Sequence, residues 1–362
     1  MNSRTVLVIG ADGVLGSTVT AAYARAGWHV LRGTRRYRGD PDSVSVDVSR
    51  PETIGPALAR ADLTVNTVAD EDLRAEQWAL EHGHRILNMA TVPVNSARRL
   101  RIRAAQSTSR GTVLLNAGLA PGVTNLVIAD MLARHPESDT IDFVMCLPAS
   151  GMAGRAAVHF VHENLTTIGQ HGVYNKRSPR HDTRTVTLPN PIGTKKCFGF
   201  AERDRAWLLD TAGGRTIRTY AYLDRPHLHR LVIALNPLGL LPDIPEAPFH
   251  LGRHSIPPHP TTEPILHWIA TSRQGTPLDI RTVECAGGYQ HAAQAALIFG
   301  NTLLQTSPPG CFNPEELLTL NSLHPQLNTA GIRVTTRNPE PTPSTEPLPR
   351  TASPRPARTA AI

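Results

Sequence analysis

Cysteine and aromatic residues are scarce in this chain, and long apolar runs are absent. Its 362 residues include four cysteines and only 5% Phe, Trp and Tyr. The cysteines are far apart and form no Cys-x-x-Cys pair, which argues against a zinc knuckle or a disulfide framework, so we expect buried free thiols. No apolar run approaches the roughly 18 residues of a membrane span, and the N-terminal pattern is not that of a signal peptide. We therefore expect a cytoplasmic protein with no membrane partner.

Acidic residues are fewer than basic ones, 30 Asp and Glu against 37 Lys and Arg, which gives a net charge of +7. The excess comes from scattered arginines without interleaved aromatic side chains, so we expect no nucleic-acid partner. Histidines such as His227, His229 and His250 match no compact ligand spacing and lie in a proline-rich region, so we expect no metal site. The length and the 40% hydrophobic content are sufficient for two domains, each with its own core.

A glycine-rich segment, Gly10-Ala-Asp-Gly13-Val-Leu-Gly16, is the most informative feature present. An apolar run at 6–9 precedes it, and a helical pattern follows it. A glycine turn between a strand and a helix lets backbone N–H groups approach a pyrophosphate, whose charge suits the helix N-terminus. A tight turn without a ligand is the alternative. The flanking strand and helix favour a dinucleotide site that includes Val14 and Leu15.

A basic pair after the second apolar segment indicates which dinucleotide binds. An acidic residue about 20 residues beyond the glycines usually binds the ribose 2′-OH of NAD, whereas arginine suits the 2′-phosphate of NADP. Thr34, Arg35 and Arg36 stand at that distance here. An arginine pair can also be a solvated loop end. The spacing favours NADP (NADPH) as the cofactor.

The first 120 or so residues alternate short apolar runs with helical patterns. We predict strands at 6–9, 28–32, 44–48, 63–68, 85–89 and 112–116. We predict helices at 13–26, 51–60 and 70–82. Strands that alternate with helices indicate an α/β fold with a doubly wound parallel (Rossmann) sheet, whose ligands bind outside the carboxyl ends of the strands.

The character of the sequence changes after about residue 122. We predict helices at 123–134, 155–168 and 291–304 and strands at 140–147 and 279–285, with short strand-like pieces between 173 and 224. This pattern indicates an inserted α+β domain with a mixed sheet. Residues 236–264 are proline-rich and are predicted to form a long loop. From Thr336 onward the chain is mostly Pro, Thr, Ser and Arg, which predicts a disordered tail.

Three further segments add to the glycine motif. They are Asp62-Leu-Thr-Val-Asn66-Thr with Glu81-His-Gly83-His-Arg-Ile-Leu-Asn88-Met-Ala90, then Gly118-Leu-Ala-Pro121-Gly122-Val-Thr-Asn, and finally Gly310-Cys-Phe-Asn-Pro314-Glu315-Glu316. Together the four segments resemble the saccharopine dehydrogenase/reductase-like NADP-dependent oxidoreductases, a family that also covers carboxynorspermidine and homospermidine synthases. The likeness spans residues 4–335.

The resemblance implies a domain organisation. It implies an NADP-binding Rossmann domain at 1–121, an inserted substrate and dimerisation domain at 122–288, C-terminal helices at 289–335 that return to the first domain, and a disordered tail at 336–362. It also implies an interdomain cleft in which nicotinamide faces a small-molecule substrate. A homodimer is a further expectation.

The resemblance also distributes the cofactor contacts along the chain. It implies Gly10, Gly13 and Gly16 at the pyrophosphate, Thr34, Arg35 and Arg36 at the 2′-phosphate, Asp47 and Val48 near adenine, Asn66, Thr67 and Val68 beside the inner ribose, and Asn88, Ala90 and Gly118 nearer the nicotinamide. For Asn66 and Asn88 the alternative role is a strand-end cap.

Two positions depart from the family pattern. Ala120 stands where saccharopine reductases carry an acidic residue suited to a substrate ammonium group, and Asn88 replaces the usual Asp after the fifth strand. Both changes remove negative charge, so they argue against saccharopine itself as the substrate.

The catalytic residues are not evident from the sequence. The weak candidates for carboxylate binding or proton donation are His159, Tyr174, Lys176 and Arg177. For each of them taken singly, a solvated surface residue is the favoured alternative. A protonated imine is already electrophilic, so its reduction requires no protein acid, whereas a ketone or enoyl substrate requires a proton donor.

Three functional hypotheses follow. The first is an NADPH-dependent oxidoreductase that reduces a C=N (imine) or related bond of a small carboxylate-bearing metabolite. The second is an enoyl or carbonyl reductase on the same scaffold. The third is a non-catalytic NADP-binding sensor or subunit, which Ala120 and the lack of a sharp catalytic constellation favour.

Overall fold

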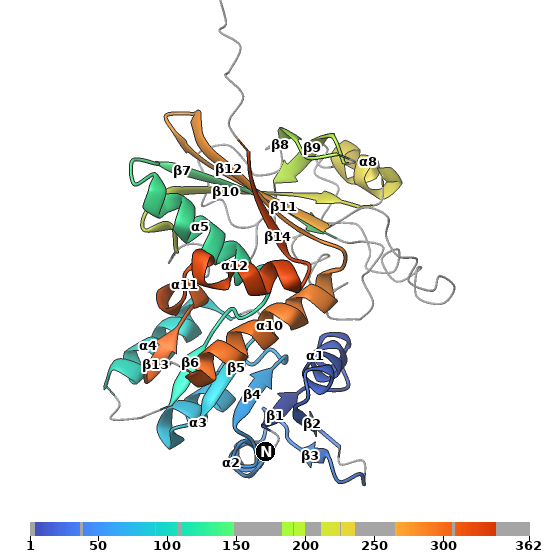
Figure 1. The fold of residues 1–362 in the computed structure, drawn as a ribbon, viewed down its shortest axis with the longest axis vertical. Coiled ribbons are helices and arrows are strands. Elements are labelled where there is room, and N and C mark those ends of the chain that lie inside the picture. The colour runs from blue at the N-terminus through green and yellow to red at the C-terminus, as the bar shows by residue number, and fades with distance from the viewer. Residues whose placement is uncertain are drawn as a thin grey trace, which may run out of the picture.

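The computed structural model describes residues 4–36, 39–90, 92–106, 111–147, 183–190, 192–199, 211–224, 226–235, 265–305 and 308–337. Two seven-stranded sheets organise this part of the chain (Figure 1). The first sheet has the order β13-β6-β5-β4-β1-β2-β3, and every pair in it is parallel. Its strands are β1 (Thr5–Ile9), β2 (His29–Thr34), β3 (Ser43–Ser45), β4 (Leu63–Asn66), β5 (Arg85–Asn88), β6 (Thr112–Leu114) and β13 (Gly310–Phe312).

Helices cover both faces of the first sheet. Val6 and Val8 of β1 belong to the core that includes α1 (Val14–Arg25) and α10 (Gly288–Gln305). Leu7 and Ile9, which alternate with them, belong to the core with α2 (Pro51–Leu58), α3 (Arg74–His82) and α4 (Val94–Gln106). Side chains of a strand point alternately to opposite faces, so a strand buried on both faces reads as a continuous apolar run. The strand order 3-2-1-4-5-6 is that of a dinucleotide-binding sheet, and the predicted Rossmann fold is confirmed.

The second sheet is mixed and has the order β14-β12-β11-β7-β10-β9-β8. Strand β7 pairs in parallel with β10, and the other pairs are antiparallel. The strands are β7 (Thr140–Leu147), β8 (Thr183–Thr187), β9 (Thr194–Gly199), β10 (Thr216–Leu223), β11 (Ile265–Arg273), β12 (Thr276–Cys285) and β14 (Arg333–Arg337). The expected second, mixed-sheet region is therefore present.

Helices α5 (Val123–Arg134) and α12 (Leu320–Thr329) lie between the two sheets (Figure 1). Helix α5 contacts β11 and β12, while α12 contacts α5, α10 and β14. The short helix α11 (Pro314–Leu317) also contacts α5, and α8 (Pro226–Leu235) lies against β9 and β10. The chain thus crosses from the first sheet to the second through α5 and returns through α10.

Helix α10 packs closely on α1, and this packing accounts for the buried hydroxyl of Tyr23 and for the glycine at position 300. Tyr23 of α1 is fully buried, and its hydroxyl donates a hydrogen bond to the carbonyl of Ala296 at 3.0 Å. A Cβ added at Gly300 would overlap this hydroxyl and would lie 2.8 Å from Cδ2 of Leu63 in β4. A side chain at Gly300 would separate α10 from both, so the returning helix depends on glycine there.

Several predicted boundaries differ from the structure for local reasons. The helix predicted from Asp70 begins at Arg74, because Leu73 is left-handed (φ 53°) and the carboxylate of Asp70 accepts the N–H of Arg74. The strand predicted at 44–48 ends at Ser45, which is the register partner of Thr34, the last residue of the neighbouring strand β2. The helix at 123–134 and the strand at 140–147 have the predicted bounds.

Strand β14 corrects the boundary of the C-terminal tail. It pairs with β12 from Arg333 to Arg337, so Thr336 and Arg337 are ordered strand residues and not the beginning of a disordered tail. It also places a piece of the second sheet outside the range 122–288 expected for the inserted domain. The other boundaries of the four expected segments stay predictions, and the predicted helix at 155–168 and loop at 236–264 lie outside the described residues.

All four cysteines are buried free thiols, as expected. Burial raises the pKa of each thiol to about 12, which makes them unreactive at neutral pH. Within the described ranges, no helix combines the length and the apolar character needed to cross a membrane.

Candidate functional site

The carboxyl ends of the parallel strands bring together most of the residues singled out in the sequence. At the end of β1 the N–H of Gly10 donates to the carbonyl of Gly33 in β2 at 2.9 Å. On the other side of β1, the N–H of Thr67 donates to the carbonyl of Ile9 at 3.2 Å. The loops after β1, β2 and β4 are therefore neighbours at the point where the strand order reverses, which is where ligands of such sheets bind.

The glycines of the first loop are required by its close packing. Gly10 has a positive φ of 82°, and a Cβ there would lie 2.6 Å from Val68 Cγ2 and 2.8 Å from Thr67 Oγ1. A Cβ on Gly16 would overlap the carbonyl of Gly10, so only glycine lets α1 begin this close to the turn. Gly13 is less constrained, since its Cβ would lie 3.3 Å from the same carbonyl oxygen. This geometry fits a backbone cradle for a pyrophosphate.

Helix α1 begins within this cradle. It starts at Val14, which is 38% exposed, and Leu15 follows it in the first turn. The first turn holds no acidic residue, and the N-cap Gly13 offers no side-chain oxygen to the free N–H groups. These donors and the positive end of the helix dipole suit a bound anion.

The basic residues after β2 lie at the same edge. Thr34 is buried, and its hydroxyl donates to the carbonyl of Arg36 at 2.7 Å, which turns the chain at the strand end. Arg35 and Arg36 are exposed, and neither is within ion-pair distance of a carboxylate in the described part of the chain. Their guanidinium groups are available to an anionic ligand.

Asp47 is a carboxylate beside this basic pair. It accepts hydrogen bonds from the side chain of Ser49 at 2.7 Å and from the Ser49 N–H at 3.0 Å. These bonds, together with the positive charge of Arg35, lower the pKa of Asp47. Val48 is half-buried, and its carbonyl accepts a bond from Arg74 of α3 at 3.3 Å. The loop after β3 is thus tied to α3.

Arg32 is a neighbour of the glycine turn that the sequence pattern did not identify. Its guanidinium donates to Asp12, inside the turn, at 3.3 Å and lies 3.9 Å from Asp40. The basic run from Arg32 to Arg36 contained a signal for it, but the partner is visible only in the fold. Arg32 links the glycine turn to β2.

Asn66 and Asn88 end neighbouring strands and form one buried network. They are register partners in β4 and β5, and they are 0% and 1% exposed. Asn66 Oδ1 accepts the N–H of Val68 at 2.9 Å, and Asn88 Oδ1 accepts the N–H of Ala90 at 2.8 Å. Both side chains therefore cap the ends of their strands. Their contact with a cofactor stays a prediction.

A buried carboxyl group, Glu76 of α3, completes this network. Its Oε1 accepts the amide N–H of Asn66 at 2.9 Å and that of Asn88 at 2.6 Å. Burial raises the pKa of Glu76, although these amide bonds partly offset the effect. Nothing in the sequence pattern pointed to Glu76, because a lone Glu on an amphipathic helix usually faces water.

The turn after β6 leads from the strand edge into α5. Gly118 N–H donates to the carbonyl of Pro121 at 3.1 Å, and the φ of Gly122 is 128°. A Cβ on Gly122 would overlap the carbonyl of Gly118, so the turn needs glycine there. Ala120 lies in this turn and is packed, partly buried, against the first core.

A second buried carboxyl group lies just behind this turn. Glu315 of α11 accepts hydrogen bonds from Thr211 at 2.6 Å and from Asn125 of α5 at 3.4 Å. Asn125 in turn accepts the N–H of Gly122 at 3.0 Å. Burial raises the pKa of Glu315. The group joins segments from three distant parts of the chain where the two sheets meet.

The four catalytic candidates, His159, Tyr174, Lys176 and Arg177, lie outside the described residues. Their roles stay predictions. Among the residues that the structure does describe, no group of three or more His, Cys, Asp or Glu side chains is arranged to hold a metal ion.

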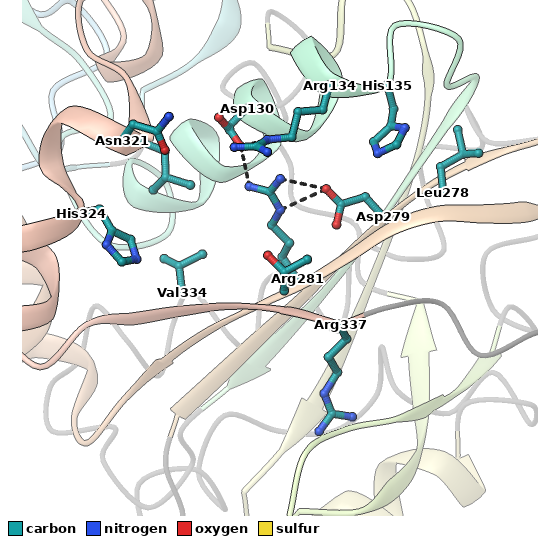
Figure 2. A pocket seen from close by; sticks show the side chains of 12 residues that line it. Asp130, Arg134, His135, Leu278, Asp279, Arg281, Asn321, His324, Val334 and Arg337 are labelled. Atoms are coloured by element: carbon teal, nitrogen blue, oxygen red, sulfur yellow. Dashed lines mark hydrogen bonds and ion pairs between the residues drawn. The ribbon is translucent and has the colours of Figure 1, made fainter.

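A separate hollow of about 320 Å³ lies between α5, β12, α12 and β14 (Figure 2). Arg281 at its centre donates to Asp130 at 2.6 Å and to Asp279 at 2.9 Å, and Arg134 also donates to Asp130. Although burial acts in the opposite direction, these two guanidinium groups hold the pKa of Asp130 below its usual value. The charges compensate one another and join β12 to α5. None of the lining residues belongs to the strand-end loops of the first sheet.

Two solved structures share this fold over nearly the whole chain. The saccharopine dehydrogenase (L-Glu forming) of Saccharomyces cerevisiae aligns with a TM-score of 0.61 and 13% identity, covering 93% of this chain and 100% of its own. The homospermidine synthase of Legionella pneumophila, solved in complex with NAD, aligns with a TM-score of 0.63 and 12% identity, covering 99% and 95%. The sequence matches no protein-family model and no curated protein. The structural likeness concerns the fold, and it supports the two-domain architecture expected from the motifs.

Proposed function

We propose that this chain is an NADPH-dependent oxidoreductase of the saccharopine dehydrogenase-like type, which reduces a C=N (imine) or related bond of a small carboxylate-bearing metabolite. The observation that carries the proposal is the shared edge of the first sheet. There the glycine turn at Gly10–Gly16 follows β1, next to the point where the strand order reverses, and the exposed pair Arg35 and Arg36 follows the neighbouring strand β2. The fold of the chain is similar to that of a saccharopine dehydrogenase.

The choice of NADPH rests on charge. A 2′-phosphate carries about two negative charges at neutral pH, and guanidinium groups bind phosphate through paired charge-assisted hydrogen bonds. Arg35 and Arg36 offer such groups directly after β2, where an NAD-binding site carries its acidic residue, and Asp47 comes only after β3. The charge at that position therefore favours the phosphorylated coenzyme.

We assign the backbone of the strand-end loops to the rest of the dinucleotide. We assign Asp47 and Val48, which follow β3, to the adenine side, and Thr67, Val68, Ala90 and Gly118, which follow β4, β5 and β6, to the nicotinamide side. The bound cofactor supplies a hydride, so the protein's task is to orient both reactants and to exclude water. Reduction of a protonated imine needs no protein acid, which agrees with the backbone and amide groups that the described strand-end loops offer.

The rest of the proposal concerns the protein's surroundings. We propose a cytoplasmic homodimer that acts on a small-molecule substrate, with neither nucleic acid nor membrane as a partner. The candidates His159, Tyr174, Lys176 and Arg177 are proposed to bind the substrate carboxylate or to donate a proton. Light scattering of the purified protein tests the dimer, since it gives either the mass of one chain or twice that mass.

The proposal is tested by following NADPH oxidation with a panel of substrates. Amines mixed with 2-oxo acids or aldehydes form imines in solution, and we expect turnover with one such pair and none with either component alone. Unsaturated acyl compounds and simple ketones without amine serve as the comparison. Turnover only with these would replace imine reduction by enoyl or carbonyl reduction. Tight NADPH binding with no turnover on any pair would indicate a non-catalytic NADP-binding protein instead.

A further inference from the structure

We propose that Glu76 is a positioning residue for the nicotinamide half of the cofactor, which it sets by holding the loops after β4 and β5 through the single pair Asn66 and Asn88. This inference rests on the proposed function. It assigns a role to a buried acid on α3 that lies behind the strand ends and contributes no atom to the front of the site.

Hydrogen bonds connect Glu76 to both loops through the two asparagines. One oxygen atom, Glu76 Oε1, accepts both asparagine amides, at 2.9 and 2.6 Å. Each asparagine uses its other polar atom to hold the backbone N–H two residues further on, at Val68 and Ala90. A displacement of the carboxyl group therefore moves both loops together. The backbone between them is also linked, because Met89 N–H donates to the carbonyl of Asn66 at 2.9 Å.

The position of Glu76 is itself fixed. Asp70 caps the start of α3 by accepting the N–H of Arg74 at 2.9 Å, and the Arg74 side chain bonds both to Asp70 at 3.0 Å and to the carbonyl of Val48. Glu76 lies in the first turn of this helix. Hydrogen bonds thus connect the helix start, the loop after β3 and the loops after β4 and β5.

The burial of the carboxyl group indicates why an acid is kept there. Glu76 is 0% exposed, and its Oε2 has no hydrogen-bond partner among the described residues. Leaving a buried polar atom unpaired is costly, so the position is poorly suited to stability alone. Burial raises the pKa of Glu76, which favours the neutral acid. In the neutral acid Oε1 still accepts both amides, and a glutamine offers the same acceptor.

The test compares two ligands on the same variants. Adenosine 2′,5′-bisphosphate reports the adenosine half of the site, and NADPH reports both halves. In Glu76→Ala both amides lose their acceptor, and we expect NADPH affinity to fall about 10- to 100-fold while bisphosphate affinity changes by less than about twofold. Glu76→Gln should restore NADPH affinity to within about threefold of the wild type. The control is Glu81→Ala, an exposed glutamate on the same helix that pairs with Arg103 and should change neither affinity.

The outcomes separate positioning from stability. Equal losses for both ligands in Glu76→Ala, or no loss for either, would overturn the proposal. If Glu76→Ala does not fold, Asn88→Ala removes one of the two ties and should show the same selective loss of NADPH affinity; an unselective loss there would also overturn it. Wild-type protein that binds neither ligand would instead contradict the proposed function.

Discussion

Two ends of the same sheet edge are built in opposite ways. After β2, the end that we assign to adenosine presents the exposed charges of Arg35 and Arg36, and the half-buried Asp47 follows β3. After β4 and β5, the nicotinamide end is a buried network of amides around one acid, in which Asn66, Asn88 and Glu76 are at most 1% exposed. Exposed charges act through solvent and are screened by salt, whereas a buried network acts through geometry. On our proposal, the first end binds the 2′-phosphate through charge, and the second end holds the loops that position the nicotinamide half.

The largest effect on cofactor affinity is expected from a substitution in the glycine turn after β1, on which both ends of the site depend. In Gly16→Ala the added methyl group overlaps the carbonyl of Gly10, so the turn must open and the start of α1 must move. We expect at least about a 100-fold loss of affinity for NADPH and NADH alike, measured by fluorescence titration. Gly13→Ala is the matched control, since its Cβ has 3.3 Å to the same oxygen, and it should lose only a few-fold. Normal binding by Gly16→Ala would show that the turn does not hold the cofactor.

The adenosine end is tested by removing its charge. In the double variant Arg35→Ala, Arg36→Ala we expect NADPH binding to weaken by about 2–4 kcal/mol, or about 30- to 800-fold, because charge-assisted hydrogen bonds to the 2′-phosphate are lost. NADH affinity should change little. Equal affinities of the variant and the wild type for NADPH would contradict the assignment of these arginines. A loss shared by both coenzymes would indicate damage to the fold, which a thermal unfolding curve reveals.

A smaller effect should appear with pH. A phosphate monoester takes up a proton near about pH 6, so its attraction to guanidinium groups weakens as the pH falls. The pKa of Asp47 is lowered, chiefly by its Ser49 hydrogen bonds, so this neighbour stays ionised and adds no pH dependence of its own there. Between about pH 7.5 and about pH 5.5 we expect NADPH affinity to fall roughly 3- to 10-fold and NADH affinity to stay level. Parallel pH profiles for the two coenzymes would contradict a phosphate-specific site.

Much of the first domain could be predicted from the sequence because its signals are local. The apolar run before Gly10, the glycine spacing and the basic pair after β2 each lie within a few residues of the structure that they form. The helix at 123–134 was equally predictable, since Pro121 and Gly122 define its start. Such patterns depend on neighbours along the chain, and no distant contact is needed to interpret them.

The rest could not be predicted because it depends on distant contacts. Glu76 meets Asn66 and Asn88 only after the sheet has formed, and no spacing in the sequence marks such a trio. Strand β14 is a short polar segment whose composition does not predict a strand. It is a strand because its backbone pairs with β12. Glu315 meets Asn125 from 190 residues away. Residues with an internal role of this kind look like ordinary surface residues until the fold is known.

Calorimetric titration of the pure protein with NADPH and with NADH tests the central claim most directly. The account predicts that NADPH binds at least about 30-fold more tightly than NADH, since the exposed guanidinium pair adds its free energy only for the phosphorylated coenzyme. Equal affinities, or no heat with either coenzyme, would contradict it.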